Sequence, residues 1–360
     1  MKILLVGENI TGNIGDQVIC SLLKRKMEVD LGINNIPLFS ITRKRTLFDK
    51  IFLKIFGNGK LFQKYDAGIY QKMLESYKDY DAFVFCGGQL FMDYFQRHIQ
   101  YIVRFCESNG IACMFNSIGI GKMTDAEKNA YEDLLSRNCV KFVSLRDNWD
   151  FFNINENVTF TYDTVLLLDN NYNSMKEGIA VGVMSPQSIW KNNPNFDAQR
   201  YREKLYDIMR VMKEQNIRCT LFTSGDYGDN KFLIDLKNSS TLLEDDDVFI
   251  PDTAEDLLRF LSNKKKVLSF RMHSLIFSID SGAECYGVVW DNKVKFLFNA
   301  LGMGNNIISL KEFIELDNFE FLTNNNITIN NLKNIREHIE EKYREMLEKI
   351  KVECTQKISN

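Results

Sequence analysis

The segment LSFRMHSLIFSIDSG, residues 268–282, places an arginine and a histidine at the end of a strand-like run. Arg271 and His273 are two positions apart, so an extended backbone would direct both, with Ser269, to one side. Arginine offers a planar fork of donors to a carboxylate or phosphate, and histidine exchanges protons near neutral pH. A helix starting near Ser274 would add its N-terminal amides. The segment therefore predicts an anion site with a proton donor, although a lone strand-end histidine is more often a packing residue.

Two further strand-like runs end in charged residues. VSLRDNW (143–149) carries Arg146 beside Asp147, and VVWDNKVKFLFNALGM (288–303) carries Lys293. Ligands of open α/β sheets bind at the carboxyl ends of the strands, which makes Arg146 and Lys293 candidates for binding the same kind of anion. The alternatives are a structural or solvated ion pair of Arg146 with Asp147 and a solvated lysine at a helix start. Taken alone, each segment favours its alternative.

A glycine-rich stretch, GENITGNIGDQVI (7–19), follows the first strand-like run and opens a helix. Gly12 and Gly15 would let a ligand approach the backbone, and the helix N-terminus attracts anions. Asn13 and Asp16 could hydrogen-bond sugar hydroxyls or accept a proton. The spacing is neither G-x-G-x-x-G nor a P-loop, so a nucleotide site is not supported. The alternative is a structural turn with Asp16 in the first helical turn.

A second stretch, CGGQL (86–90), places Gly87 and Gly88 between a strand and a helix, where a tight turn is the simpler explanation. No histidine or cysteine spacing indicates a metal, and we expect neither a metal nor a cofactor. The net charge of −3 over 360 residues gives no basic footprint for nucleic acid. The eight cysteines form no CxxC pair, which favours a reducing compartment.

We therefore expect a cytoplasmic protein without a spanning helix. One segment leaves a peripheral contact with the inner membrane surface open. Residues 43–64, RKRTLFDKIFLKIFGNGKLFQK, hold seven basic residues against one aspartate, with apolar residues at helical spacing. Basic amphipathic helices can lie on anionic membranes. The alternative is a helix that caps the first domain and keeps its basic side in water.

Short apolar runs alternate with helical periods in two blocks, which indicates parallel sheets covered on both faces. We predict an α/β fold with two doubly wound, Rossmann-like domains, at 1–170 and 177–325, and an amphipathic C-terminal helix at 330–352 that packs across them. The first five strands are expected at 2–7, 82–88, 111–117, 141–147 and 158–163. The other six are expected at 178–184, 218–225, 247–251, 265–271, 284–290 and 306–310.

Taken in order, these segments resemble the polysaccharide pyruvyl transferase family. The matching pieces are GNIGDQ, CGGQL, VSLRD, YDTVLLL, SFRMHSLIFSIDSG and WDNKVKFLFNALGM, which cover the chain from residue 7 to about residue 303. Each piece alone is weak, but the ordered set is specific, above all R-x-H-S followed by D-x-K. The sequence departs from the family pattern at Cys86, usually a glycine, at Asp150, commonly a serine, and at Thr164, usually a proline.

The resemblance implies a fold like that of the GT-B glycosyltransferases with the active site in the cleft. It implies transfer of the enolpyruvyl carbons of phosphoenolpyruvate onto two hydroxyls of a free or lipid-linked sugar, leaving a pyruvate ketal and phosphate. By position, Arg146, Arg271, His273 and Lys293 match the family's basic residues around the donor, with His273 as the acid. The glycine-loop motif is expected to face the acceptor. A nucleotide-sugar-dependent glycosyltransferase and a non-catalytic sugar-phosphate binding protein remain the alternatives.

Overall fold

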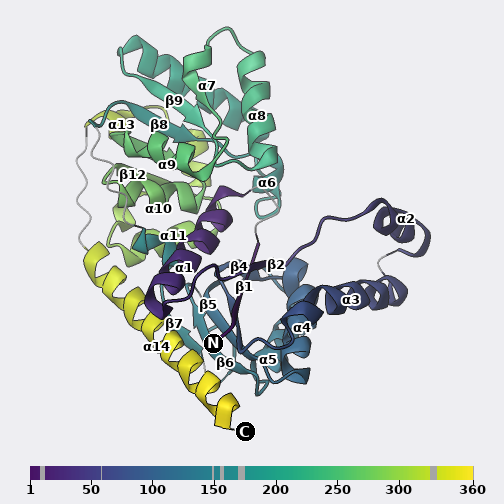
Figure 1. Ribbon diagram of the computed structural model, residues 1–360. Helices are drawn as coiled ribbons and strands as arrows, with labels where there is room; N and C mark the ends of the chain where they lie inside the picture. Colours follow the sequence, from purple (N-terminus) through teal and green to yellow (C-terminus); the bar gives the residue numbers. More distant parts are fainter. Residues whose placement is uncertain are drawn as a thin grey trace. The chain divides into compact units, whose positions relative to one another are not determined.

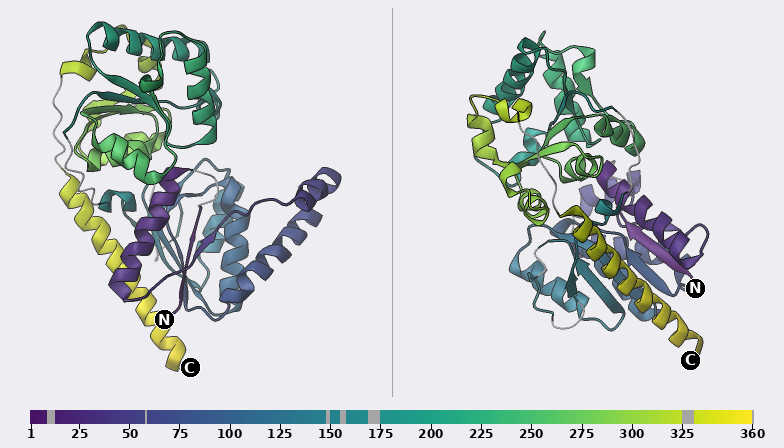
Figure 2. Two further views of the ribbon diagram at one scale, coloured as in Figure 1. Left: turned by 45° about the horizontal axis from the view of Figure 1, so that its top comes forward. Right: turned by 90° about the vertical axis from the view of Figure 1, so that its left-hand side faces the viewer.

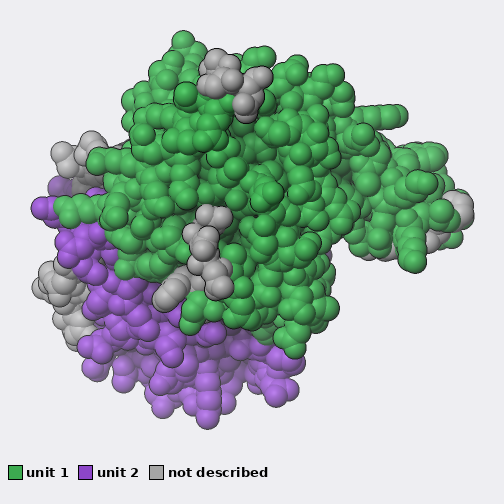
Figure 3. All heavy atoms as spheres, turned by 90° about the horizontal axis from the view of Figure 1, so that it is seen from below, with its two compact units in different colours: residues 1–11, 19–164, 337–360 green, residues 12–18, 165–336 purple. Residues whose placement is uncertain are grey.

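The computed structural model describes residues 1–8, 13–57, 59–147, 150–154, 158–168, 175–324 and 331–359 (Figure 1). The chain divides into two compact units, which Figure 3 distinguishes by colour. Unit 1 comprises residues 1–11, 19–164 and 337–360, and unit 2 comprises residues 12–18 and 165–336. The chain passes from unit 1 to unit 2 between Thr164 and Val165.

Unit 1 contains a seven-stranded sheet in the order β2-β1-β3-β5-β6-β7, with β4 pairing with β5, all in parallel. Its strands are β1 (Ile3–Gly7), β2 (Leu38–Ser40), β3 (Ala82–Phe85), β4 (Gly88–Phe91), β5 (Ala112–Ile120), β6 (Val140–Leu145) and β7 (Val158–Phe160). The five predicted strands are confirmed. β2, of three residues, and β4 were not predicted. The tight strand–helix turn expected at CGGQL is wrong, because the chain forms β4 before the next helix begins.

Helices cover both faces of this sheet. The helices of unit 1 are α1 (Ile14–Leu31), α2 (Leu47–Phe56), α3 (Lys60–Leu74), α4 (Asp93–Ser108), α5 (Asp125–Leu135) and α14 (Leu332–Ser359), of which α2 packs on α3 and not on the sheet. Leu4 and Val6 share a core with α3, α4 and α5, so alternation turns Ile3 and Leu5 to the other face. There α1 and α14 run side by side (Figure 2), joined by the ion pair of Lys26 with Glu340 at 2.9 Å.

The C-terminal helix confirms the predicted amphipathic pattern and extends to Ser359. Its apolar stripe, Ile335, Ile339, Tyr343, Met346 and Ile350, is buried. No helix in the described part of the chain has the length and apolar character needed to cross a membrane.

Unit 2 contains a six-stranded parallel sheet in the order β10-β9-β8-β11-β12-β13. Its strands are β8 (Ile179–Gly182), β9 (Cys219–Phe222), β10 (Val248–Phe249), β11 (Lys266–Ser269), β12 (Glu284–Val289) and β13 (Ile307–Ser309), which confirms all six predictions. Its helices are α6 (Pro186–Trp190), α7 (Ala198–Glu214), α8 (Tyr227–Asn238), α9 (Ala254–Ser262), α10 (Met272–Asp280), α11 (Asn292–Ala300), α12 (Leu310–Glu315) and α13 (Glu320–Asn324). The core of one face joins the strands to α7, α8 and α12.

The pair α2 and α3 projects from the rest of unit 1 (Figure 1). A buried ion cluster lies at its base. Arg43 donates through Nη1 to Asp49 at 2.6 Å and through Nη2 to Asp66 at 2.6 Å, and both carboxylates are buried. The hydrogen bond from Arg43 lowers the pKa of Asp49 below its usual range. Farther out, the rings of Phe52 and Tyr65 stack at 5.0 Å. This helical hairpin, residues 43–66, is therefore held by internal charge and aromatic contacts.

The Asp49→Asn substitution should loosen this hairpin at neutral pH, because it replaces a charged acceptor of Arg43 with an amide. A hydrogen bond to a charged group is worth about 1.5–3 kcal/mol, so protection of α2 amides from hydrogen exchange should fall roughly ten- to hundredfold. An aspartate whose folded pKa is depressed stabilises the fold above its unfolded pKa of about 4 and loses that contribution as the pH falls. The difference between variant and wild type should therefore shrink on acidification below about pH 4.

The matched control is Asp245→Asn, which removes the partner of Lys237 at a carboxylate that is 91% exposed. Exposed pairs contribute less than about 1 kcal/mol, so this variant should leave the protection of α2 unchanged. Equal protection in wild type and Asp49→Asn at neutral pH would show that the cluster does not hold the hairpin.

Candidate functional site

In unit 1, Arg146 follows the last residue of β6 and is buried, with 8% of its surface exposed. It forms a buried ion pair with Asp163, 17 residues further along the chain. The neighbouring strand makes room for it, because a Cβ on Gly119 would lie 2.7 Å from Arg146 Nε. This Nε is buried and has no hydrogen-bond partner among the described residues. Asp147 instead accepts a hydrogen bond from the Ile120 amide at 2.8 Å.

The pairing corrects one sequence-based alternative. Arg146 and Asp147 are both buried, which excludes a solvated ion pair between these two neighbours. Arg146 instead pairs with Asp163, which follows β7. The residue after Asp163 is hydrogen-bonded to β5, because the Thr164 amide donates to Ser117 Oγ at 3.2 Å. Thr164 stands where the family usually has proline, and this hydrogen bond uses an N–H that proline lacks.

Gly87 and Gly88 both have positive φ angles, of 117° and 88°. A Cβ on Gly87 would lie 3.2 Å from the carbonyl oxygen of Asn116. The pair therefore has a backbone role, in turning the chain from β3 into β4 close against β5. A role in ligand binding stays a prediction.

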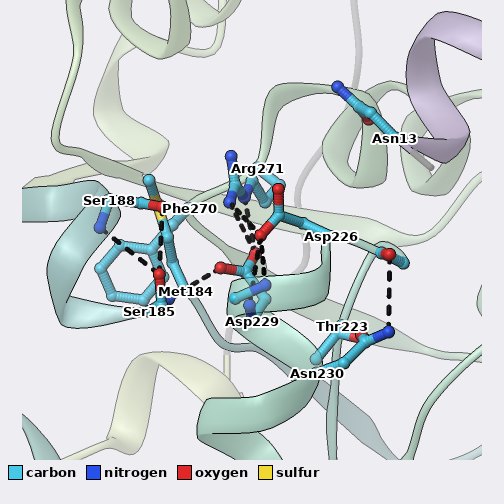
Figure 4. A network of polar contacts seen from close by, with 12 residues as sticks. Asn13, Met184, Ser185, Ser188, Thr223, Asp226, Asp229, Asn230, Phe270 and Arg271 are labelled. Atoms are coloured by element: carbon cyan, nitrogen blue, oxygen red, sulfur yellow. Dashed lines mark hydrogen bonds and ion pairs between the residues drawn. The ribbon is translucent and has the colours of Figure 1, made fainter. Parts of the chain in front are cut away.

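In unit 2, Arg271 is the N-cap of α10 and is paired with two carboxylates (Figure 4). Its Nε donates to Asp229 at 2.8 Å, and its Nη2 lies 3.7 Å from Asp226. Asp229 is fully buried and also accepts from the Ser185 amide at 2.8 Å. Burial raises the pKa of Asp229, against the opposing effect of Arg271. No described residue accepts a hydrogen bond from Nη1 of Arg271, so part of the donor fork remains available.

His273 lies in the first turn of α10, which begins at Met272. The extended alternation expected from Ser269 through His273 is therefore wrong beyond Arg271, whose amide donates to Ser269 Oγ at 3.1 Å. The imidazole packs on the backbone of Gly15: a Cβ there would lie 1.9 Å from Nδ1. The absence of a side chain at Gly15 is thus a geometric requirement of the histidine's position.

The start of α1 holds the polar residues that the sequence singled out. Asn13 Oδ1 accepts from the Gly15 amide at 3.1 Å, and Asn13 Nδ2 donates to Asp16 at 2.8 Å. Because His273 packs on Gly15, the structure brings this turn and the strand-end histidine together within unit 2. Gly12 lies outside the described residues.

Lys293 lies in the first turn of α11, whose N-cap is Asp291. The backbone amide of Lys293 donates a hydrogen bond to the Asp291 carboxylate at 3.1 Å. Its ammonium lies 4.9 Å from the centroid of the Trp290 ring, and Trp290 Nε1 donates to the carbonyl of Phe270 at 2.7 Å. β12 pairs with β11, so Lys293 and Arg271 follow adjacent strands. Ser274 is fully buried, and its Oγ has no hydrogen-bond partner among the described residues.

Sequence reasoning did not identify the aspartates that pair with the two arginines. Asp163 ends a strand-like run, and Asp226 and Asp229 lie in SGDYGDN, directly after β9. The available signal was the same one that marked the arginines, namely a charged residue at the carboxyl end of a strand. The sequence does not show which aspartate forms an ion pair with which arginine.

The two parallel sheets, each with a buried or half-buried arginine at a strand end, define a two-domain α/β protein with Rossmann-like, GT-B-like domains. A model of the polysaccharide pyruvyl transferase family matches residues 13–292, and the chain belongs to this family. A search of curated proteins finds no match.

Solved structures share the fold at low sequence identity. UDP-GlcNAc 2-epimerase from Methanocaldococcus jannaschii aligns with a TM-score of 0.56 and 10% identity, over 96% of this chain and 99% of that one. Anabaena Alr3699/HepE, solved with UDP and glucose, aligns with a TM-score of 0.53 and 10% identity, over 100% and 98%. Staphylococcus aureus MnaA, solved with UDP, aligns with a TM-score of 0.53 and 11% identity, over 89% of each chain. At these identities the similarity establishes the fold alone.

The Gly119→Ala substitution tests the space that Arg146 occupies. Because the new methyl group would lie 2.7 Å from Nε, the guanidinium must move away from Asp163, and overpacking of this kind costs about 1–3 kcal/mol. Denaturant unfolding should show a lower free energy of unfolding by that amount. Gly68→Ala is the matched control, since nothing lies within 4 Å of its Cβ position and alanine favours a helix by about 0.5–1 kcal/mol. Equal stability of the two variants would contradict the steric role of Gly119.

Proposed function

We propose that the protein transfers the enolpyruvyl group of phosphoenolpyruvate onto two hydroxyls of a sugar, forming a pyruvate ketal in polysaccharide biosynthesis. The proposal rests on the family of the chain and on the arrangement of three basic residues in unit 2. His273 packs on Gly15 in the first turn of α1, while Arg271 and Lys293 follow adjacent strands of the same sheet.

Donor recognition follows from charge. Phosphoenolpyruvate carries a carboxylate and a phosphate, and a guanidinium binds either through paired hydrogen bonds. Asp229 holds Arg271 through Nε, which fixes the plane of the guanidinium and leaves Nη1 for the donor. Lys293 contributes a second positive charge, and the amides at the start of α10 contribute partial positive charge. Arg146 lies in unit 1, and its role in binding the donor stays a prediction.

The reaction needs a proton on the methylene carbon of the donor. His273 gives that proton and leaves an oxocarbenium-like carbon, which the first sugar hydroxyl attacks, returning its proton to His273. The second hydroxyl then replaces phosphate at the same carbon, and its proton leaves with the phosphate. Two carbon–oxygen bonds form, one breaks, and no oxidant or reductant is needed. Arg271 and Lys293 stabilise the departing phosphate by preorganised charge.

Acceptor binding is assigned to the first turn of α1. Asp16 is held by the Asn13 amide at 2.8 Å, which orients its carboxylate as a hydrogen-bond acceptor for a sugar hydroxyl. Asp16 is also the candidate base that takes the proton of the second hydroxyl and passes it to the departing phosphate. The polysaccharide context of the family supports a sugar or lipid-linked saccharide as the acceptor.

Replacing His273 with asparagine should lower kcat for phosphate release from phosphoenolpyruvate by roughly 10²–10⁴-fold, the usual contribution of a general acid. Binding of phosphoenolpyruvate should be largely retained, because the cationic residues are unchanged. Gly15→Ala should also lower kcat, since its methyl group would displace the imidazole. The measurement is coupled detection of phosphate with a panel of sugar acceptors, together with mass spectrometry of the ketal.

Gly68→Ala is the matched control for Gly15→Ala and should keep full activity. Circular dichroism of each variant separates loss of chemistry from loss of fold. Full activity in a folded His273→Asn variant would remove the histidine from the mechanism.

Donor binding is tested by calorimetric titration of phosphoenolpyruvate, UDP-glucose, GDP-mannose and CMP-sialic acid into the wild type and an Arg271→Ala variant, each with and without acceptor sugars. We expect phosphoenolpyruvate to bind the wild type and its affinity to fall at least tenfold in the variant, because charge-assisted hydrogen bonds are worth about 1.5–3 kcal/mol. Binding of a nucleotide sugar without binding of phosphoenolpyruvate would contradict the pyruvyl proposal and favour a glycosyltransferase.

A further inference from the structure

The projecting hairpin, defined here as residues 43–66, exposes large apolar side chains. In α2 and at the start of α3 these are Leu47 (74% exposed), Phe48 (58%), Ile51 (48%), Ile55 (66%) and Leu61 (62%). Large apolar side chains exposed together mark an interaction surface rather than ordinary surface scatter. The alternative, a helix that caps the first domain and keeps its basic side in water, does not account for these exposed apolar side chains.

The apolar side chains of α2 occupy two distinct faces. At about 100° per residue, Leu47, Ile51 and Ile55 form one stripe along the helix. Phe52 lies on another face and packs against Phe62 and Tyr65, with ring centroids at 6.1 and 5.0 Å. The inner face is thus already used to hold α2 on α3, and the outer stripe remains exposed.

Basic residues flank the outer stripe. Lys50 and Lys54 lie on α2 within about 60° of Leu47. Six basic side chains of the hairpin are exposed, and none forms an ion pair with a described residue; these are Lys44, Arg45, Lys50, Lys54, Lys60 and Lys64. The acidic residues of the hairpin, Asp49 and Asp66, are buried against Arg43. The internal cluster therefore removes the negative charge from the surface and leaves only positive charge beside the apolar stripe.

We propose that this hairpin is a docking element for an anionic lipid surface, with the outer stripe of α2 inserted among the acyl chains and the lysines at the headgroups. Apolar burial and attraction to anionic lipid act together in such helices, and lysine stems lie along apolar surface while their ammonium groups stay in water. A protein partner fits less well, because lysine is depleted at protein–protein interfaces. Figure 1 shows α2 and α3 extending away from the rest of unit 1.

The proposal does not depend on the reaction assigned above, because lipid binding requires neither donor nor acceptor. It does give that reaction a location, since an enzyme held on a lipid surface meets lipid-linked saccharides directly. The Arg43 cluster would keep the hairpin rigid, so that the exposed stripe is preformed before contact.

The test is co-sedimentation of the full chain with two kinds of vesicle, one of phosphatidylcholine and one of equal parts phosphatidylcholine and phosphatidylglycerol. We expect binding to the anionic vesicles and little to the neutral ones. Each lysine near an anionic surface contributes about 1 kcal/mol, so the double variant Lys50→Glu with Lys54→Glu should bind at least about tenfold more weakly. The triple variant Leu47→Ser, Ile51→Ser and Ile55→Ser should lose binding while keeping its lysines.

The matched control reverses two exposed lysines of unit 2, Lys265→Glu with Lys311→Glu, which gives the same change in net charge. This control should bind as the wild type does. Absence of binding to anionic vesicles, or equal loss in the control, would overturn the proposal. A wild-type dimer that the triple variant converts to monomer, without vesicle binding, would instead assign the stripe to a second copy of the chain. Phosphate release with a soluble acceptor should be unchanged in all of these variants.

Discussion

The structure depends on a simple electrostatic constraint: a guanidinium taken out of water must be matched by a nearby negative charge. Arg146 meets this condition with Asp163, and Arg271 meets it with Asp229. In each unit the arginine follows one strand, and the aspartate lies in the segment that follows a different strand of the same sheet. The ion pairs therefore hold connections together as well as neutralising charge. They also fix each guanidinium in one orientation, which is the preorganisation that recognition of a carboxylate or phosphate requires.

Two glycines leave the space that Arg146 and His273 occupy. Arg146 and His273 each lie against a glycine at a distance that any Cβ would violate, at Gly119 and Gly15 respectively. The two glycines serve different ends. Gly119 leaves space for a buried ion pair beside the sheet, whereas Gly15 lets an imidazole pack on the first turn of α1, directly after Asn13. The imidazole thus comes to lie beside an amide and a carboxylate, and the proposed ketal formation rests on this arrangement.

The α2–α3 hairpin uses buried charge for another purpose. Arg43, Asp49 and Asp66 are buried at its base, while several large apolar side chains of α2 are exposed, which is the opposite of what these residue types usually do. Such an arrangement is stable because the charges satisfy one another and accept further hydrogen bonds, as Asp49 does from the Thr46 amide at 2.6 Å. The three solved structures described above share this fold but are only 10–11% identical to this chain. The role of the hairpin is therefore inferred from its own residues.

The sequence by itself determined the alternation of strands and helices, because hydrophobic periodicity is a local property. It also identified the family, since the R-x-H-S and D-x-K motifs lie within short segments. Only the tertiary structure decided the partners. Asp229 lies 42 residues before Arg271, and Gly15 and His273 belong to two separate segments of unit 2, residues 12–18 and 165–336, so no local pattern could pair them. The short strand β4 was missed for a related reason: its pairing with β5, rather than any pattern of its own, makes it a strand.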